Sequence, residues 1–197
     1  MKTVFISAKP TPFERQLVSR FYSEGYKVFV SGLHEPCEKI DIYIDVTNRR
    51  ERKDKFSIRD GLDETIMRRV YRTNVQKSIK MLEKYLPLLD KGEDKRLCFI
   101  SGVDASINET KDTYGYAYKM SKAAMHNLFM IAWNTLEKDG YTFRVYDPLL
   151  SEVKPVASAE GAFTYFTSNR GTENDDPLRN DENRLVLRDA LGREHTW

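Results

Sequence analysis

The chain has 197 residues, 40% of them apolar, which is enough for one globular domain with a substantial core. Its 32 basic and 30 acidic residues leave a net charge of +2, so the composition does not indicate a nucleic-acid-binding protein. No apolar stretch approaches the roughly 18 residues that a membrane span needs, and the two cysteines lack the spacing of a zinc site or a disulfide framework. We therefore expect a cytoplasmic protein without a metal site.

Short apolar runs alternate with amphipathic stretches through the first half of the chain. The runs predict strands at 3–6, 27–30, 40–46 and 97–100. A turn with Pro10 and Pro12 precedes a predicted helix that ends at Gly25, and a long helix is predicted at about 62–89, bent near Pro87. The basic run at 49–55 is interrupted by acids, so we interpret it as a solvated loop, with an anionic ligand or partner as the alternative.

The second half continues the alternation, with a helix at about 116–137, a strand at 142–146, a helix at 158–167 with Ser158 as its N-cap, and a last strand at 184–188. Strands that alternate with helices predict a doubly wound, mostly parallel α/β sheet covered on both faces. We expect one domain spanning 1–197. Ligands of such sheets bind at the carboxyl ends of the strands.

Tyr118 and Lys122 stand four residues apart at the start of a predicted helix, so they share one helix face. A nearby ammonium favours the phenolate and would lower the pKa of the tyrosine, which suits proton transfer at a carbonyl or alcohol. The spacing alone is common, and surface or packing roles for the pair are the alternative. The pair follows the fourth predicted strand, and this position in the chain favours a functional role.

In this context the chain resembles the short-chain dehydrogenase/reductase family along nearly its whole length, which implies a Rossmann-like fold. The family's catalytic tyrosine and lysine correspond to Tyr118 and Lys122, and its helical asparagine corresponds to Asn74. The family serine position holds Gly102, so Ser101 or Ser106 would have to replace it, and we take Ser101 as the candidate. The resemblance implies that tyrosine transfers a proton, lysine holds a ribose, asparagine supports a proton path and serine stabilises an oxyanion.

The resemblance also implies NAD or NADP as cofactor. Its expected contacts here are Ser7, Lys9, Ser31, Lys122 and Pro148. The family's glycine-rich phosphate turn falls on 7–14, where Ala8, Pro12 and Glu14 replace all three glycines. Only nine residues, 31–39, separate the second and third strands, too few for the helix and strand that the family places there.

Two hypotheses follow. In the first, the protein is an NAD(P)-dependent oxidoreductase that acts on a small carbonyl or alcohol substrate through Tyr118 and Lys122. In the second, it is a non-enzymatic relative, a scaffold or ligand-binding protein that has lost ordinary dinucleotide binding. By analogy with the family we expect a homodimer or homotetramer paired through the helices at 62–89 and 116–137, with no nucleic acid or membrane as partner.

Overall fold

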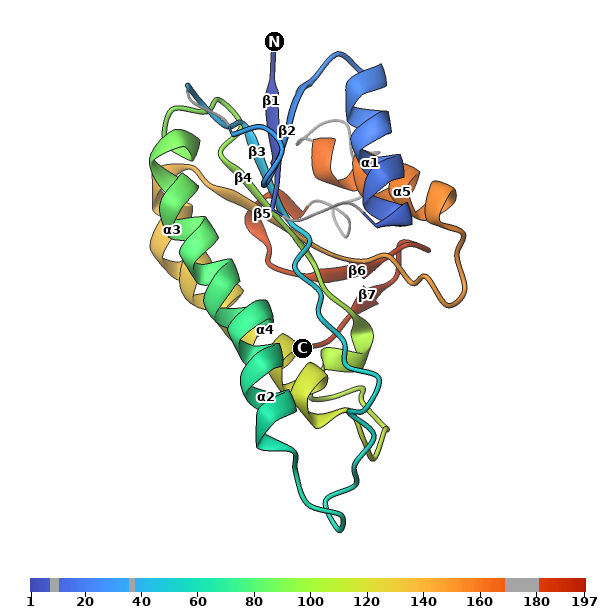
Figure 1. Ribbon diagram of the computed structural model, residues 1–197. Helices are drawn as coiled ribbons and strands as arrows, with labels where there is room; N and C mark the ends of the chain where they lie inside the picture. Colours follow the sequence, from blue (N-terminus) through green and yellow to red (C-terminus); the bar gives the residue numbers. More distant parts are fainter. Residues whose placement is uncertain (8–10, 36–37, 169–180) are drawn as a thin grey trace.

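A seven-stranded sheet forms the centre of the molecule in the computed structural model, which describes residues 1–7, 11–35, 38–168 and 181–197 (Figure 1). Its strands lie in the order β2-β1-β3-β4-β5-β6-β7, parallel except for the last pair. Their bounds are β1 Thr3–Ile6, β2 Lys27–Val30, β3 Ile42–Asp45, β4 Arg96–Ile100, β5 Thr142–Asp147, β6 Leu187–Asp189 and β7 Glu194–His195. The predicted doubly wound α/β class is confirmed.

Because the connection after β2 is short, β2 forms one edge of the sheet. β2 pairs only with β1 among the described strands, and the chain then crosses to β3 on the other side of β1. The carboxyl ends of β1, β3, β4 and β5 therefore meet along one side of the sheet, where such folds bind ligands.

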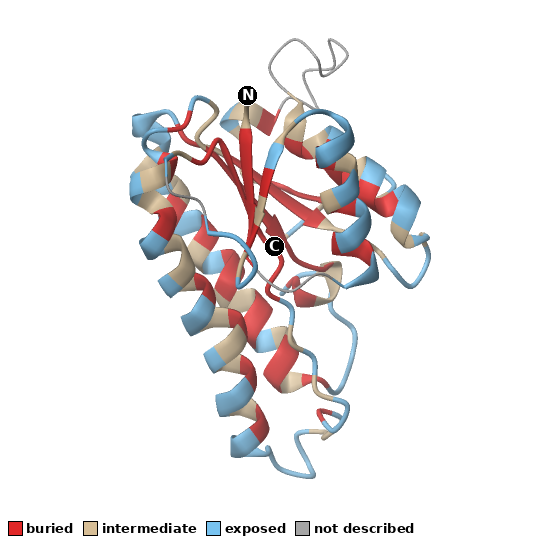
Figure 2. Ribbon diagram, turned by 45° about the horizontal axis from the view of Figure 1, so that its top comes forward, coloured by how far each residue is buried: buried red, intermediate tan, exposed pale blue. Residues whose placement is uncertain are grey.

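Helices cover both faces of the sheet (Figures 1 and 2). One apolar core packs α1 Pro12–Ser23 and α5 Pro155–Thr167 against the sheet. On the other face lie α2 Glu64–Tyr71, η1 Arg72–Lys77, α3 Ser78–Leu89 and α4 Tyr116–Leu136, with a second core. Full burial stabilises the fold by about 1.5–3 kcal/mol for each large apolar side chain. The sheet strands in Figure 2 are almost wholly buried, which explains their continuous apolar runs.

The long helix predicted at 62–89 differs from expectation in its middle. Asp63 caps it by accepting hydrogen bonds from the Thr65 and Ile66 amides. Residues 72–77 then form a π turn, while the α-helix continues through Pro87 to Leu89. The irregularity therefore lies at Asn74 and not at the proline, and π turns of this kind are frequent at functional sites.

Two predicted boundaries are wrong near the end of the chain. Ser158 is not an N-cap, because Lys154 and Pro155 begin α5 one turn earlier and the Ser158 hydroxyl donates to the Pro148 carbonyl at 2.7 Å. The last predicted strand starts too early, since β6 covers only Leu187–Asp189 and a short β7 follows it. Within the described ranges, no helix has both the length and the apolarity of a membrane span.

Candidate functional site

Tyr118 lies at the start of α4, and the Arg50 side chain covers its ring. From the sequence, the segment of Arg50 was interpreted as a solvated loop. The Arg50 guanidinium lies 3.8 Å from the centre of the Tyr118 ring and donates to its hydroxyl at 2.9 Å. It also pairs with Asp104 at 3.1 Å. Burial raises the pKa of Tyr118, and the Arg50 charge opposes this only in part. The expected lowering of the tyrosine pKa is therefore not found.

Lys122 is buried on the same face of α4 and is committed to the protein backbone. Its ammonium donates to the Thr47 carbonyl at 2.8 Å and to the Ile100 carbonyl at 3.0 Å. These carbonyls follow β3 and end β4, so the lysine ties α4 to the carboxyl edge of the sheet. Burial lowers the pKa of Lys122 to about 8, against the opposing influence of the Asp45 charge.

Asn74 lies inside the π turn and clamps the segment that carries Arg50. Its Oδ1 accepts from the Arg49 amide at 2.7 Å, and its Nδ2 donates to the Arg49 carbonyl at 3.1 Å. Nδ2 also donates to the Ser121 hydroxyl on α4 at 2.9 Å. The Asn74 side chain thus holds the backbone next to Arg50 against α4.

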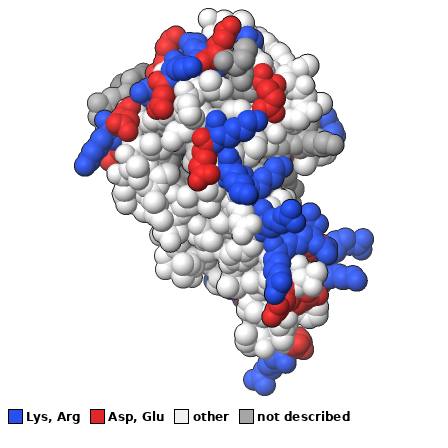
Figure 3. Space-filling view, turned by 60° about the vertical axis from the view of Figure 1, so that its left-hand side comes forward, with Lys and Arg blue, Asp and Glu red and all other residues white. Residues whose placement is uncertain are grey.

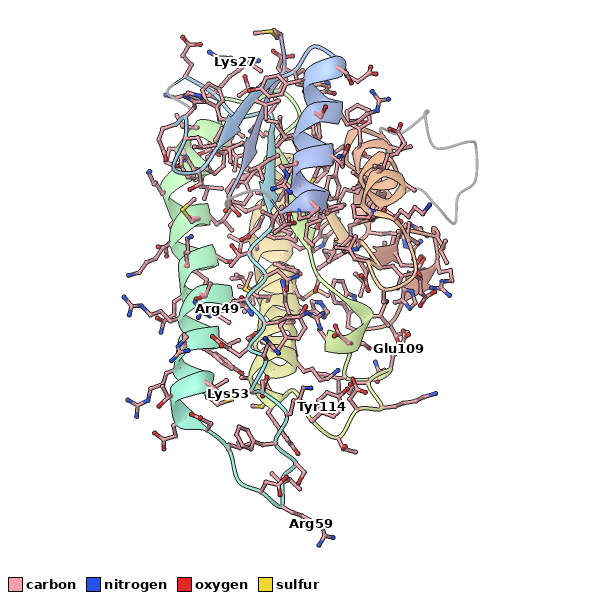
Figure 4. The ribbon with its side chains drawn as sticks, turned by 45° about the vertical axis from the view of Figure 1, so that its right-hand side comes forward. Lys27, Arg49, Lys53, Arg59, Glu109 and Tyr114 are labelled. Atoms are coloured by element: carbon pink, nitrogen blue, oxygen red, sulfur yellow. The ribbon has the colours of Figure 1, made fainter. Side chains whose placement is uncertain are left out.

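An acidic side chain, Asp54, also fixes the same segment to α4. Asp54 accepts hydrogen bonds from the Ala117 amide at 3.3 Å and the Tyr118 amide at 3.0 Å. These are free amides of the helix N-terminus, where a carboxylate is stabilising. Figure 4 shows the segment with Arg49 and Lys53 passing alongside α4 to a tip near Arg59. Arg50 therefore sits on a segment anchored before and after it.

Ser101 and Gly102 follow β4, where the family serine is expected. The Ser101 hydroxyl lies 2.6 Å from Nε2 of His126 on α4. Burial, followed by the Lys122 charge, lowers the pKa of His126 to about 3, so its imidazole is neutral at pH 7. Such a weak base does not activate a serine nucleophile, and the pair is better explained as a packed hydrogen bond.

The space of a side chain at Gly102 is taken by Asp104. A Cβ added at Gly102 would lie 2.6 Å from Oδ1 of Asp104. This oxygen is buried without a hydrogen-bond partner in the described part of the chain, while Oδ2 pairs with Arg50. A carboxylate thus occupies the place where the resemblance implies a hydroxyl donor to an oxyanion.

A cavity of about 380 Å³ opens beside these groups at the carboxyl ends of β4 and β5. Arg50, Asp104, Asp147 and Ser101 line it together with Asn48, Gly102, Val103 and residues 148–151. Asp147 accepts from the Val103 and Leu149 amides, and burial raises its pKa. Because the cavity holds two carboxylates and one guanidinium, it suits a small polar ligand with hydrogen-bond donors.

In its described part, the expected phosphate turn holds a carboxylate against one of its backbone amides. Pro12 is the first residue of α1 and has no N–H, and the Thr11 amide before it donates to Glu14 at 2.8 Å. Glu14 is buried, which raises its pKa. Next to this turn the Asp45 carboxylate accepts from the Ser7 hydroxyl at 3.0 Å. Ala8 and Lys9 lie outside the described residues.

The described residues of this turn do not form the usual phosphate site for NAD or NADP. A pyrophosphate needs free amides and positive potential at the helix N-terminus, whereas Glu14 occupies one amide and Asp45 adds a second carboxylate nearby. Lys122, the expected ribose ligand, already donates to two carbonyls. Of the remaining cofactor candidates, Pro148 lines the cavity and the Ser31 amide donates to the Ile6 carbonyl at 2.9 Å.

The predicted catalytic residues are brought to one side of the sheet, but each has a protein partner. Tyr118 binds Arg50, Lys122 binds backbone carbonyls, Asn74 binds Arg49 and Ser101 binds His126. The alternative serine, Ser106, accepts from the Asn108 and Glu109 amides in a turn.

Sequence reasoning missed Arg50 and Asp104 as site residues, although a carboxylate two positions after Gly102 was a usable signal. Among the described residues, no cluster of histidine, cysteine and acids forms a metal site.

Solved structures share this fold at low sequence identity. The carbonyl reductase Sniffer of D. melanogaster matches with a TM-score of 0.79 and 12% identity, over 100% of both chains. A carbonyl reductase from Pseudomonas aeruginosa PAO1 in complex with NADP matches with a TM-score of 0.76 and 14% identity, over 100% of both chains. A putative short-chain dehydrogenase/reductase from Burkholderia multivorans with bound NADP gives 0.72 and 14%, over 100% of this chain and 99% of that one.

No family model and no curated protein matches the chain. Structural likeness at 12–14% identity establishes the fold. The predicted resemblance is therefore confirmed at the level of architecture: the chain is built on the short-chain dehydrogenase/reductase fold.

Proposed function

We propose that this protein is a ligand-binding relative of the short-chain dehydrogenases/reductases that does not use a dinucleotide. The observation that carries the proposal is the position of Arg50, which stacks on Tyr118, donates to its hydroxyl and is held by Asp104. A substrate carbonyl would have to displace this guanidinium to reach the phenol. Its developing oxyanion would then face Asp104 where a hydroxyl donor is needed.

Electrostatics supports the same conclusion. An unpaired like charge at about 4 Å costs roughly 4 kcal/mol at an effective dielectric constant of about 20, which is as large as the benefit of an oxyanion-hole donor, about 2.7–4 kcal/mol. The Arg50 cation that pairs with Asp104 offsets part of this cost. At the phosphate turn, a carboxylate near the helix end costs on the order of 1–2 kcal/mol. Charge therefore disfavours both the oxyanion beside Asp104 and the phosphates beside Glu14.

The ligand site of this proposal is the cavity of about 380 Å³ beside β4 and β5. It would take a small polar molecule through Arg50, Asp104 and Asp147, with Ser101 as a further hydroxyl. No step of the proposal involves hydride or electron transfer.

A second candidate, an oxidoreductase for small carbonyl compounds, is favoured by the convergence of Tyr118, Lys122 and Asn74 at one edge of the sheet. The carbonyl reductase in complex with NADP that shares the fold supports it by analogy. In that case Arg50 would move away from the Tyr118 hydroxyl when substrate binds, and Tyr118 would transfer the proton.

One experiment separates the two. The wild type, Arg50→Ala and Arg50→Ala/Tyr118→Phe are assayed for consumption of NADPH and NADH against a panel of small aldehydes, ketones and diketones. The proposal predicts no reduction above background in all three. Turnover that appears in Arg50→Ala and is lost with Tyr118→Phe would establish the capped oxidoreductase instead.

A further inference from the structure

In the cavity beside β4 and β5, the protein's own carboxylates occupy the donors that an anionic ligand would need. The Val103 and Leu149 amides both donate to Asp147, at 2.8 Å each. The Arg50 guanidinium pairs with Asp104 at 3.1 Å. Because charge-assisted hydrogen bonds of this kind are strong, an anionic ligand would compete poorly for these donors.

The acceptors of the same cavity are far less occupied than its donors. Each carboxylate has about four lone-pair sites, whereas the described residues supply only two hydrogen bonds to Asp147 and one ion pair to Asp104. Oδ1 of Asp104 is buried and has no hydrogen-bond partner in the described part of the chain. The cavity therefore favours a ligand with several hydrogen-bond donors.

The two carboxylates lie on either side of one position. A Cβ built on Gly102 would lie 2.6 Å from Oδ1 of Asp104 and 3.8 Å from Oδ2 of Asp147. These two oxygens are therefore no farther apart than the sum of the two distances. Gly102 itself lines the cavity. A single group with several N–H bonds suits this arrangement better than separate donors.

The described charged groups at the cavity carry an excess of negative charge. Arg50, Asp104 and Asp147 line it. Burial has the largest influence on the pKa of the nearby Lys122, and the charges of Asp45, Asp104 and Asp147 raise it. Two cations thus face three carboxylates, so a ligand with one positive charge would balance them. Such a ligand would also favour the charged form of Asp147, whose pKa is raised by burial.

This local excess is opposite in sign to the charge of the whole chain. The net charge is +2, and Figure 3 shows Lys and Arg side chains in a band across one face of the molecule. A cation therefore gains nothing from the overall field of the protein. Its binding would depend on the carboxylates of the cavity.

Apolar groups form another part of the cavity wall: Val103, Pro148, Leu149 and Leu150. Leu149 has a φ of 48°, in the left-handed region that large side chains rarely adopt, and its amide is held by Asp147. Strained residues of this kind cluster at ligand sites. The wall suits the carbon skeleton of an organic cation, whereas a metal ion such as Ca²⁺ requires six to eight oxygen ligands.

We propose that the ligand of this cavity is a small primary amine whose ammonium group lies between Asp104 and Asp147. The ammonium supplies three N–H donors and one positive charge, and the carbon skeleton lies against Val103 and residues 148–150. This inference rests on the proposed ligand-binding function and assigns the chemical class of the ligand.

The test compares three probes that share a phenyl group: 2-phenylethylamine, 2-phenylethanol and phenylacetate. The ¹⁵N-labelled wild type is titrated with each, and the NMR shifts of the Val103 and Leu149 amides report binding in the cavity, because both amides are bound to Asp147. We expect saturable shifts with the amine and a Kd at least ten-fold lower than that of the alcohol or the acid. The N,N,N-trimethyl derivative keeps the charge without N–H donors and should bind more weakly than the amine.

Variants locate the preference in the two acids. Asp147→Asn should reduce the advantage of the amine over the alcohol to less than two-fold. Asp104→Asn/Asp147→Asn leaves Arg50 as the charged residue among the described lining residues, so the preference should turn to phenylacetate. The matched control Glu152→Gln removes an exposed carboxylate next to the cavity wall and should change the Kd of the amine by less than two-fold. Circular dichroism verifies that each variant is folded.

Other outcomes overturn the inference, and the wild-type titrations alone are sufficient for two of them. Equal or tighter binding of the alcohol or the acid would refute the amine but keep the ligand site. No saturable shift with any probe at tens of millimolar would refute the ligand site as well. Equal weakening by Glu152→Gln would reduce the preference to general electrostatics. Larger shifts of the same amides with calcium chloride would assign the acids to a metal ion.

Discussion

The region around Tyr118 on α4 and the N-terminus of α1 differ in separate ways from the pattern of the family that the chain resembles. The residue types of the resembled family are present as Tyr118 and Lys122 on α4 and as Asn74 on η1, but each is bound to a protein group. At α1 the residue types themselves have changed, and Glu14 occupies the amide of Thr11. The comparison teaches that a retained side chain indicates a retained fold position, whereas its partners decide whether it can act.

The largest expected effect concerns the α4 edge. Asn74→Ala removes three hydrogen bonds, to the Arg49 amide, the Arg49 carbonyl and Ser121. We expect the free energy of unfolding to fall by about 2–4 kcal/mol, measured by urea denaturation. Gln76→Ala, an exposed neighbour in the same π turn, should change it by less than about 0.5 kcal/mol. Similar losses in both variants would contradict a clamping role for Asn74.

A second prediction addresses the α1 edge. Pro12→Gly/Glu14→Gly removes the carboxylate at the helix start and returns an amide donor. Relief of about 1–2 kcal/mol from the charge and about 1 kcal/mol from the donor corresponds to roughly 30- to 150-fold tighter NADPH binding. Calorimetry should show this gain, while Glu38→Gly, which removes an exposed acid elsewhere, should not. No gain in the double variant would mean that the loss of binding arises away from α1.

A smaller effect tests whether Asp104 has replaced the family serine. Gly102→Ser places a Cβ close to Asp104 Oδ1, so Asp104 must move and its pairing with Arg50 is disturbed. We expect a loss of about 1 kcal/mol in unfolding free energy that Asp104→Ala in the same chain largely removes. Additive losses in this double-mutant cycle would show that the two positions do not compete for space.

The smallest predicted effect lies outside the cleft, where His195 bridges Glu109 and Asp189 at 3.0 Å each. Burial lowers the pKa of His195, but these two hydrogen bonds outweigh it and raise the pKa overall, while the pKa of each acid is lowered. The histidine contribution to stability is therefore complete below about pH 6.5 and is lost as the pH rises through the raised value.

His195→Gln should remove that part of the pH dependence. Unfolding free energies of the wild type and the variant, measured between pH 5.5 and 8.5, should differ most at the acidic end and converge at the basic end. A constant difference across the range would show that protonation of His195 does not stabilise the fold. The opposite trend at lower pH belongs to Glu109 and Asp189, whose contribution is lost as they protonate.

The sequence predicted the architecture well because periodicity and turn residues report local structure and burial directly. The strands β1 to β5, the helix of Tyr118 and the shortened edge after β2 follow from such patterns. The π turn at Asn74 was not predictable, since it depends on contacts with Arg49 and Ser121 that are distant in sequence. The predicted N-cap at Ser158 was wrong for a local reason, because the helix already begins at Pro155.

The sequence predicted that the candidate residues lie on one side of the sheet, but it did not predict their contacts. Spacing placed Tyr118 and Lys122 on one face, yet no periodicity could show that Arg50, 68 residues earlier, covers the phenol. Gly102 was recognised as a loss, whereas the carboxylate that fills its space became visible only in three dimensions. The dimer or tetramer expected by analogy stays a prediction.

The central claim is that the fold is retained without its dinucleotide. We would titrate the purified protein with NADH and NADPH, following nucleotide fluorescence and calorimetric heat. The account predicts no saturable binding up to millimolar nucleotide, because Glu14 and Asp45 occupy the phosphate end and Lys122 is bound to the backbone. Saturable binding in the micromolar range would contradict it and return Tyr118 to the role of a proton donor.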